Sequence, residues 1–125
     1  MNRIPSPSPY APTIGFSAAV RAGNVIHVAG TTAVNHDNEI VGGDDPAAQM
    51  REVLRKIEHA LREASASLEH VVRTRIYLTD AADWEAVGRV HGEAFASIRP
   101  AASMLMIGLL DPRMRVEVEA IAYAT

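Results

Sequence analysis

The stretch Arg115-Val-Glu-Val-Glu-Ala-Ile-Ala-Tyr123 decides the fold. Its residues alternate as in an extended strand, with Val116 and Val118 on one face. Glu117 and Glu119 lie on the other face. A strand with one apolar and one polar face is typical of an antiparallel sheet that is covered on one side only. The sequence therefore predicts a sheet with a second face free to pack, and in a chain of 125 residues we expect another subunit there.

Two helices precede this strand. Asp45-Pro46 predicts the start of the first, because an aspartate cap accepts from free amides and proline at the first helical position loses no hydrogen bond. This helix should run to about Ala64, and its apolar residues form one stripe at three- and four-residue spacings: Met50, Val53, Leu54, Ile57, Leu61 and Ala64. Asp80 caps the second helix, which should reach about Ser97. Arg99-Pro100 ends it, since the residue before a proline is driven out of helical space.

The remaining strands follow from alternation and from turn residues. Gly23-Asn24 predicts a hairpin between two short strands within residues 15–30, and a third short strand is expected at 39–41. Residues 72–79 alternate, so that one face carries Val72, Thr74, Ile76 and Leu78. A strand at 102–107 is separated from the last one by a turn at Asp111-Pro112. We therefore predict a single α+β domain with a mainly antiparallel six-stranded sheet and both helices on one face.

The N-terminal segment differs in composition. Residues 4–12 (IPSPSPYAP) contain four prolines, which fix φ and remove the amide donors that a helix or sheet would use. We therefore interpret residues 1–12 as an irregular or extended proline-rich arm and residues 13–125 as the folded domain. The arm is either a loosely ordered tail or a segment that contacts a ligand.

The composition excludes several classes of protein. Twelve Lys and Arg against fifteen Asp and Glu give a net charge of −3, so we expect no nucleic-acid partner. The chain has no cysteine, and its five histidines show no paired ligand spacing, so we expect no metal and no cofactor. Neither a membrane span nor the apolar run of a signal peptide is found. The sequence predicts a soluble cytoplasmic protein without membrane contact.

Motifs along nearly the whole chain carry a resemblance to a known family. They are Gly15-Phe16, Ala19-Val-Arg-Ala-Gly-Asn24, Val28-Ala-Gly30, Gln49, Val71-Val-Arg-Thr74, Tyr77-Leu-Thr-Asp80, Arg99-Pro-Ala101 and, most specifically, Val116-Glu-Val-Glu-Ala-Ile-Ala122. In these motifs the chain resembles the RidA/YjgF family, whose fold is related to that of the trimeric chorismate mutase. The resemblance implies a homotrimer that binds small molecules in three clefts at its subunit interfaces.

The resemblance also implies a reaction. Enzymatic members of this family hydrolyse reactive enamines and imines to 2-oxo acids and ammonia. That chemistry needs a cation for the substrate carboxylate and a group that aims water at the imine carbon. By resemblance, Glu117 is the water-orienting carboxylate, and Gly15, Gly30 and Thr31 match positions near the ligand.

The chain departs from the family at the ligand-contacting positions. Ala102 stands where active members have an arginine, and loss of that charge-assisted contact should cost several kcal/mol (about 1.5–3 for each such bond). The other replacements are Phe16 for tyrosine, Ala29 for serine, Gly88 for asparagine and Met104 for cysteine; Ser103 and His91 complete the predicted cleft lining. This more apolar cleft should prefer a less charged or larger ligand.

Some of these residues also have structural explanations. Glu117 and Glu119 could pair with Arg73 and Arg75 across a subunit contact, and Arg75 is alternatively a displaced carboxylate anchor. His91 is either a packed helix residue or a proton carrier near the cleft, because imidazole titrates near neutrality.

Two functions fit these observations. The first is a Rid-type hydrolase that converts an enamine or imine to a carbonyl compound and ammonia, with an altered substrate preference. The second is a non-catalytic metabolite-binding or regulatory trimer. The ribonuclease activity attached to the family's name fits least, because the chain is acidic and lacks a basic stripe.

Overall fold

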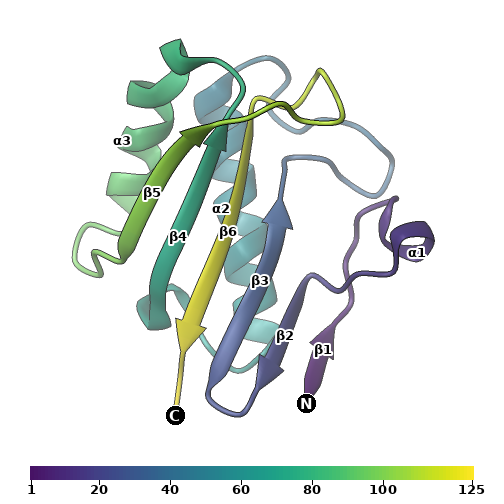
Figure 1. The fold of residues 1–125 in the computed structure, drawn as a ribbon, viewed down its shortest axis with the longest axis vertical. Helices are drawn as coiled ribbons and strands as arrows, with labels where there is room; N and C mark the ends of the chain where they lie inside the picture. The colour runs from purple at the N-terminus through teal and green to yellow at the C-terminus, as the bar shows by residue number, and fades with distance from the viewer.

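The strand predicted from the alternation, Val116–Tyr123 (β6), lies inside a six-stranded sheet in the computed structural model, which describes residues 1–125 (Figure 1). The other strands are Asn2–Ile4 (β1), Ala19–Ala22 (β2), Val25–Thr31 (β3), Val71–Leu78 (β4) and Ala101–Met106 (β5). Their order is β1-β2-β3-β6-β4-β5, and only β4 and β5 run parallel. The predicted mainly antiparallel sheet is confirmed.

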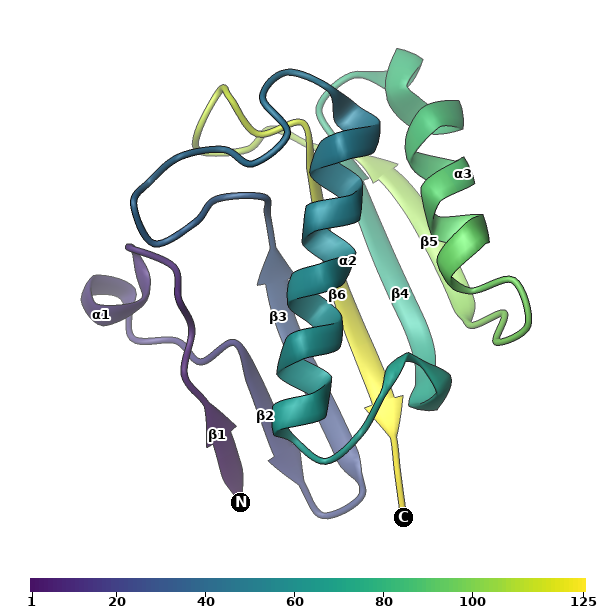
Figure 2. The same ribbon diagram turned by 180° about the vertical axis from the view of Figure 1, so that it is seen from behind.

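Two long helices, Pro46–Glu63 (α2) and Trp84–Ala94 (α3), cover one face of this sheet (Figure 2). The Asp45 side chain accepts from the amides of Ala47 and Ala48, which is the predicted cap. Every residue of the predicted apolar stripe is buried, and it packs against the buried side of β6: Val116, Val118, Ala120 and Ala122. The side chains of Glu117 and Glu119 consequently project from the face of β6 that carries no helix.

The N-terminal arm differs from its prediction. Asn2–Ile4 pairs with β2 as an edge strand, and Ile4 is buried in the core. These residues precede the first proline, so their amides are free to join a sheet. The prolines act only beyond Ile4, where residues 5–10 form no regular element and Ala11–Ile14 (α1) makes a single turn.

Three further details of the predicted elements are wrong. Residues 39–41 form no strand but a single bridge between Val34 and Ile40, because closely spaced turns leave no length for one. Val72 is 50% exposed, because the register shifts between Val71 and Arg73 and Val71 takes the core position. The second helix begins with a 3-10 turn at Ala81–Asp83 (η2), and α3 ends at Ala94 rather than Ser97. Apart from these differences, a further 3-10 turn, Leu68–His70 (η1), precedes β4.

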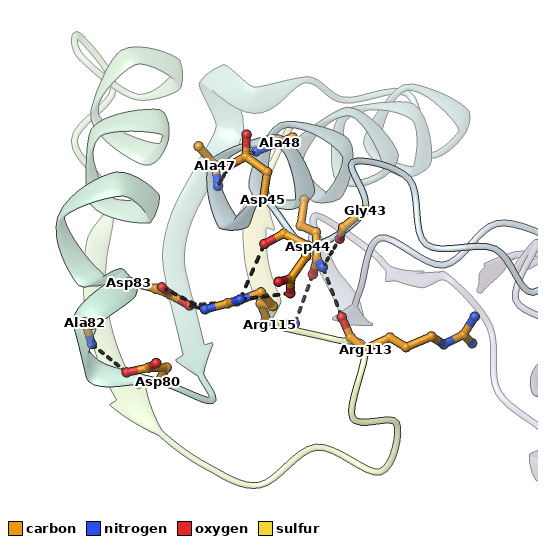
Figure 3. Close-up of polar contacts among 11 residues, drawn as sticks. Gly43, Asp44, Asp45, Ala47, Ala48, Asp80, Ala82, Asp83, Arg113 and Arg115 are labelled. Carbon is orange, nitrogen blue, oxygen red and sulfur yellow. Dashed lines mark hydrogen bonds and ion pairs between the residues drawn. The ribbon is translucent and has the colours of Figure 1, made fainter.

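A polar cluster fixes the start of β6 against both helices (Figure 3). The Arg115 guanidinium lies 3.1 Å from the Asp83 carboxylate before α3 and 2.8 Å from the Asp44 carboxylate before α2. Gln49 of α2 is fully buried, accepts from the Arg115 amide and donates to two loop carbonyls. These contacts fix the backbone two residues before Glu117.

None of the helices has the length and apolarity that a membrane crossing needs.

Candidate functional site

A cavity of about 940 Å³ lies beside the end of β3 that is no longer paired with β2. β2 pairs with β3 only as far as Val28, and one more hydrogen bond joins the Ala29 amide to Ala18. Beyond it, Gly30 and Thr31 have no strand on their outer side, and the cavity occupies that space. Five predicted site residues line it: Phe16, Ala29, Gly30, Thr31 and Glu117. We call these five the Glu117 group.

The Glu117 carboxylate is held against the backbone of Gly30. A methyl group on Gly30 would lie 2.6 Å from Glu117 Oε1, so only glycine permits this approach. Glu117 is partly buried and makes no hydrogen bond or ion pair within the chain. Burial, and to a lesser degree the charge of Glu119, raise the pKa of Glu117 above its ordinary value. A free, partly desolvated carboxylate in a cavity is suited to orienting water or accepting a proton.

The neighbouring charged residues contact partners other than Glu117. Glu119 accepts a hydrogen bond from the Tyr77 hydroxyl and lies 3.5 Å from Arg75. The pairing expected across a subunit contact is therefore present for Glu119 within one chain. Arg73 instead donates to Ser103 Oγ at 3.1 Å. Since Arg75 already lies against Glu119, the geometry gives no support to its interpretation as a displaced carboxylate anchor.

The other predicted residues form a separate group at the edge strand β5. Ala102 pairs with the buried Thr74, so Ala102 and Met104 point to the helix side, and a methyl group on Gly88 of α3 would lie 3.8 Å from Met104 Cε. His91 is hydrogen-bonded to Thr74 Oγ1 at 2.9 Å. We call Gly88, His91, Ala102, Ser103 and Met104 the β5 group.

Within one chain the two groups do not meet. β4 separates β5 from β6, a distance of about 10 Å at the usual strand spacing. Glu117, moreover, lies on the face opposite to Ala102 and Met104. Ser103 alone shares the face of Glu117. Gly15 ends α1 with φ 84° next to Phe16 but does not line the cavity.

His91 is partly buried beneath Phe95. Their ring centroids lie 4.6 Å apart, and burial lowers the pKa of His91. The ring is therefore uncharged near neutral pH. With Thr74 as its partner, it is a packed residue within the single chain.

The cavity is also lined by the N-terminal arm, which the sequence left as either a loose tail or a ligand contact, and by residues of α2 and of the loop before β6 that the sequence did not indicate. The arm contributes residues 5–8 and Tyr10, α2 contributes Arg55, Lys56 and His59, and the loop before β6 contributes residues 108–112. Lys56 Nζ donates to Thr32 O at 2.6 Å and to Val34 O at 2.8 Å. The position of Lys56 beside the apolar stripe is a sequence signal for its partial burial. No such signal exists for the cavity, because its location depends on where β2 stops pairing with β3. No three His, Cys, Asp or Glu side chains gather as a metal site.

Comparisons with known proteins agree with this architecture. Residues 7–124 match the family described as Endoribonuclease L-PSP. The chain is 36% identical to the 3-aminoacrylate deaminase RutC of Acinetobacter baylyi over 94% of this chain and 91% of that protein.

Solved structures show the same fold. Rv2704 of Mycobacterium tuberculosis, a member of the YjgF/YER057c/UK114 family, superposes with a TM-score of 0.89 at 47% identity over 98% of both chains. The YjgF gene product of Escherichia coli superposes with a TM-score of 0.85 at 27% identity over the whole of both chains.

Proposed function

Because the chain belongs to the Endoribonuclease L-PSP (YjgF/RidA) family, we propose that it binds a small enamine or imine metabolite and hydrolyses it to a carbonyl compound and ammonia. The observation that carries this proposal is the Glu117 carboxylate, held free of ion pairs against Gly30 in a large cavity. In its ionised form it would accept a proton from water and direct that water at the imine carbon.

The substrate preference should differ from that of members that keep the arginine. No cation stands at Ala102; the nearby Arg73 donates one hydrogen bond to Ser103, and Arg75 lies 3.5 Å from Glu119. Phe16 and Ala29 add apolar surface beside Glu117. A small 2-imino acid, whose carboxylate adjoins the reacting carbon, would therefore be held weakly.

We also propose that the working form is a cytoplasmic homotrimer. On the face that carries no helix, Leu105 is 46% exposed and Tyr123 is 52% exposed, which favours a covering subunit. A second copy could also bring its β5 group to the Glu117 group, which one chain cannot do. Sedimentation equilibrium tests this, and a monomer at micromolar concentration would contradict it.

The function is tested by measuring ammonia release from freshly generated 2-iminopropanoate, 2-iminobutanoate and a set of uncharged imines. We expect wild type to turn over an imine and Glu117→Gln to lose at least about 100-fold, the usual contribution of a general base. Glu119→Gln is the matched control, since it removes the neighbouring carboxylate from the same strand face. Loss of activity in both variants alike would count against a specific role for Glu117.

A non-catalytic binding trimer is the second candidate, favoured by the apolar Ala102 in place of the family's arginine. In that case wild type is inactive on every imine, while Ala102→Arg gains deamination of 2-imino acids. Activity of wild type that depends on Glu117 excludes this candidate.

A further inference from the structure

The cavity continues around the edge of the sheet to its helix side. Glu117 lies on the face without helices, whereas Lys56 and His59 project from α2 on the other face, yet all three line the same cavity. The passage lies beside Gly30 and Thr31, where β3 has no outer partner strand. A ligand at Glu117 can therefore extend past this edge towards α2.

Lys56 is the only lysine of the chain, and its charge is incompletely compensated. Its ammonium group has three N–H donors, of which two are used by Thr32 O and Val34 O. No carboxylate lies within ion-pair distance of it. Glu52, the acid whose charge acts on Lys56, is bound to Arg55 through two contacts of 2.7 Å. Buried charges are normally paired, so the third donor of Lys56 is suited to an anion.

The other ionisable groups at this end of the cavity are already engaged. Arg55 is bound to Glu52, and His59 lies 3.7 Å from Glu63. Asp111 is held by Arg113 at 2.7 Å. Lys56 is thus the cation of the cavity wall that has no carboxylate partner.

We propose that Lys56 is a specificity-determining anchor for the carboxylate at the far end of an elongated substrate. The reacting imine carbon would lie at Glu117, the chain would pass Gly30 and Thr31, and the distal carboxylate would bind Lys56 Nζ. This inference rests on the proposed function and names the substrate class for it: an imine or enamine with an acid group at a distance, rather than a 2-imino acid.

The dimensions of the site favour a substrate in which several bonds separate the imine carbon from the distal carboxylate. Gly30, which touches Glu117, and Thr32, which binds Lys56, are two residues apart, or about 7 Å of extended chain. Roughly five carbon–carbon bonds span that distance. The cavity of about 940 Å³ lies at the upper end of the range of about 300–1,000 Å³ typical of small-molecule sites, and is large for a three- or four-carbon acid. A cation at Lys56 would also explain why Ala102 needs no charge.

Calorimetric titration with stable ketones tests the anchor without requiring turnover. We expect 6-oxoheptanoate, with five bonds between its carboxyl and ketone carbons, to bind wild type at least tenfold more tightly than 2-oxobutanoate or methyl 6-oxoheptanoate. Lys56→Met should lose about 10- to 100-fold of that affinity, the range for one charge-assisted contact. Arg51→Met is the matched control, because Arg51 is an exposed cation of the same helix outside the cavity.

A labelling experiment on the wild type covers the case in which Lys56→Met disturbs the fold. Met1 and Lys56 carry the only two amines of the chain, so acetylation can be followed at both by mass spectrometry. Bound 6-oxoheptanoate should slow acetylation of Lys56 and leave that of Met1 unchanged. Equal binding of all three ketones, no binding by wild type, or no protection of Lys56 at saturation would each overturn the proposal.

The two proposals fail in different ways. If 6-oxoheptanoate binds through Lys56 but no imine is hydrolysed, the anchor stands and the catalytic function fails. If imines are hydrolysed through Glu117 while Lys56→Met leaves both affinity and imine preference unchanged, the function stands and the anchor is wrong.

Discussion

Replacing Gly30 with alanine should separate the function of the site from the stability of the fold. The new methyl carbon would lie 2.6 Å from Glu117 Oε1 and 3.0 Å from Cδ, whereas ordinary contact begins at 3.4 Å. The carboxylate must therefore move by about 0.8 Å, the difference between 3.4 and 2.6 Å. Because the displaced atoms form the far end of a flexible side chain, the backbone can keep its place.

A displacement of this size has a large effect on chemistry and a small one on folding. A misplacement of about 1 Å can reduce catalysis roughly 100-fold, so we expect a loss of about 30- to 100-fold in imine hydrolysis by Gly30→Ala. Gly30 does not adopt a positive φ, so alanine meets no backbone strain there. The free energy of unfolding should change by less than about 1 kcal/mol, equivalent to a few degrees in Tm.

Gly108→Ala is the matched control, since Gly108 lines the same cavity but a methyl group there contacts nothing within 4 Å. The assays are ammonia release and thermal unfolding for both variants. Full activity of Gly30→Ala would refute the assigned position of Glu117. A drop in Tm beyond about 8 °C would refute the claim that the side chain alone moves.

Further predictions follow from the charged residues. Since burial raises the pKa of Glu117, imine hydrolysis should increase as pH rises through a value above that of an ordinary glutamate; a rate profile flat from pH 4 to 8 would contradict this. The folded state binds the Glu117 proton more tightly than the unfolded chain, so the stability that protonated Glu117 contributes is lost as pH rises through its folded pKa. The difference in Tm between Glu117→Gln and wild type should therefore be more positive at pH 7 than at pH 4. Arg115→Met should destabilise the fold by about 2–4 kcal/mol in urea unfolding, because Asp83 loses its cation, whereas the exposed Arg62→Met should cost less than about 1 kcal/mol. Gln49→Leu should cost about 2–5 kcal/mol by leaving buried loop groups without partners, and an unchanged midpoint would disprove that bonding role.

Local patterns were sufficient to predict most of the fold. The start of α2 at Pro46 follows from the Asp45 cap, and the burial of Val116 and Val118 follows from strand alternation. Two of the local predictions failed because a nonlocal contact decided the outcome. Asn2–Ile4 is a strand only because β2 offers it an edge, and Val72 leaves the core because the register with β6 shifts beside it.

The sequence by itself determined the single α+β domain, both long helices and the strands of the hairpin and of the C-terminal half, because helix caps, turns and periodicity act over a few residues. It indicated the candidate carboxylate Glu117 only through the resemblance to a known family. Only the tertiary structure placed Glu117 against Gly30, separated both from Ala102 by an intervening strand, and brought Lys56 into the same cavity. These relations depend on which strands are neighbours and on where β2 stops pairing with β3. Such pairings join residues far apart in the chain, and no local pattern encodes the distance between them.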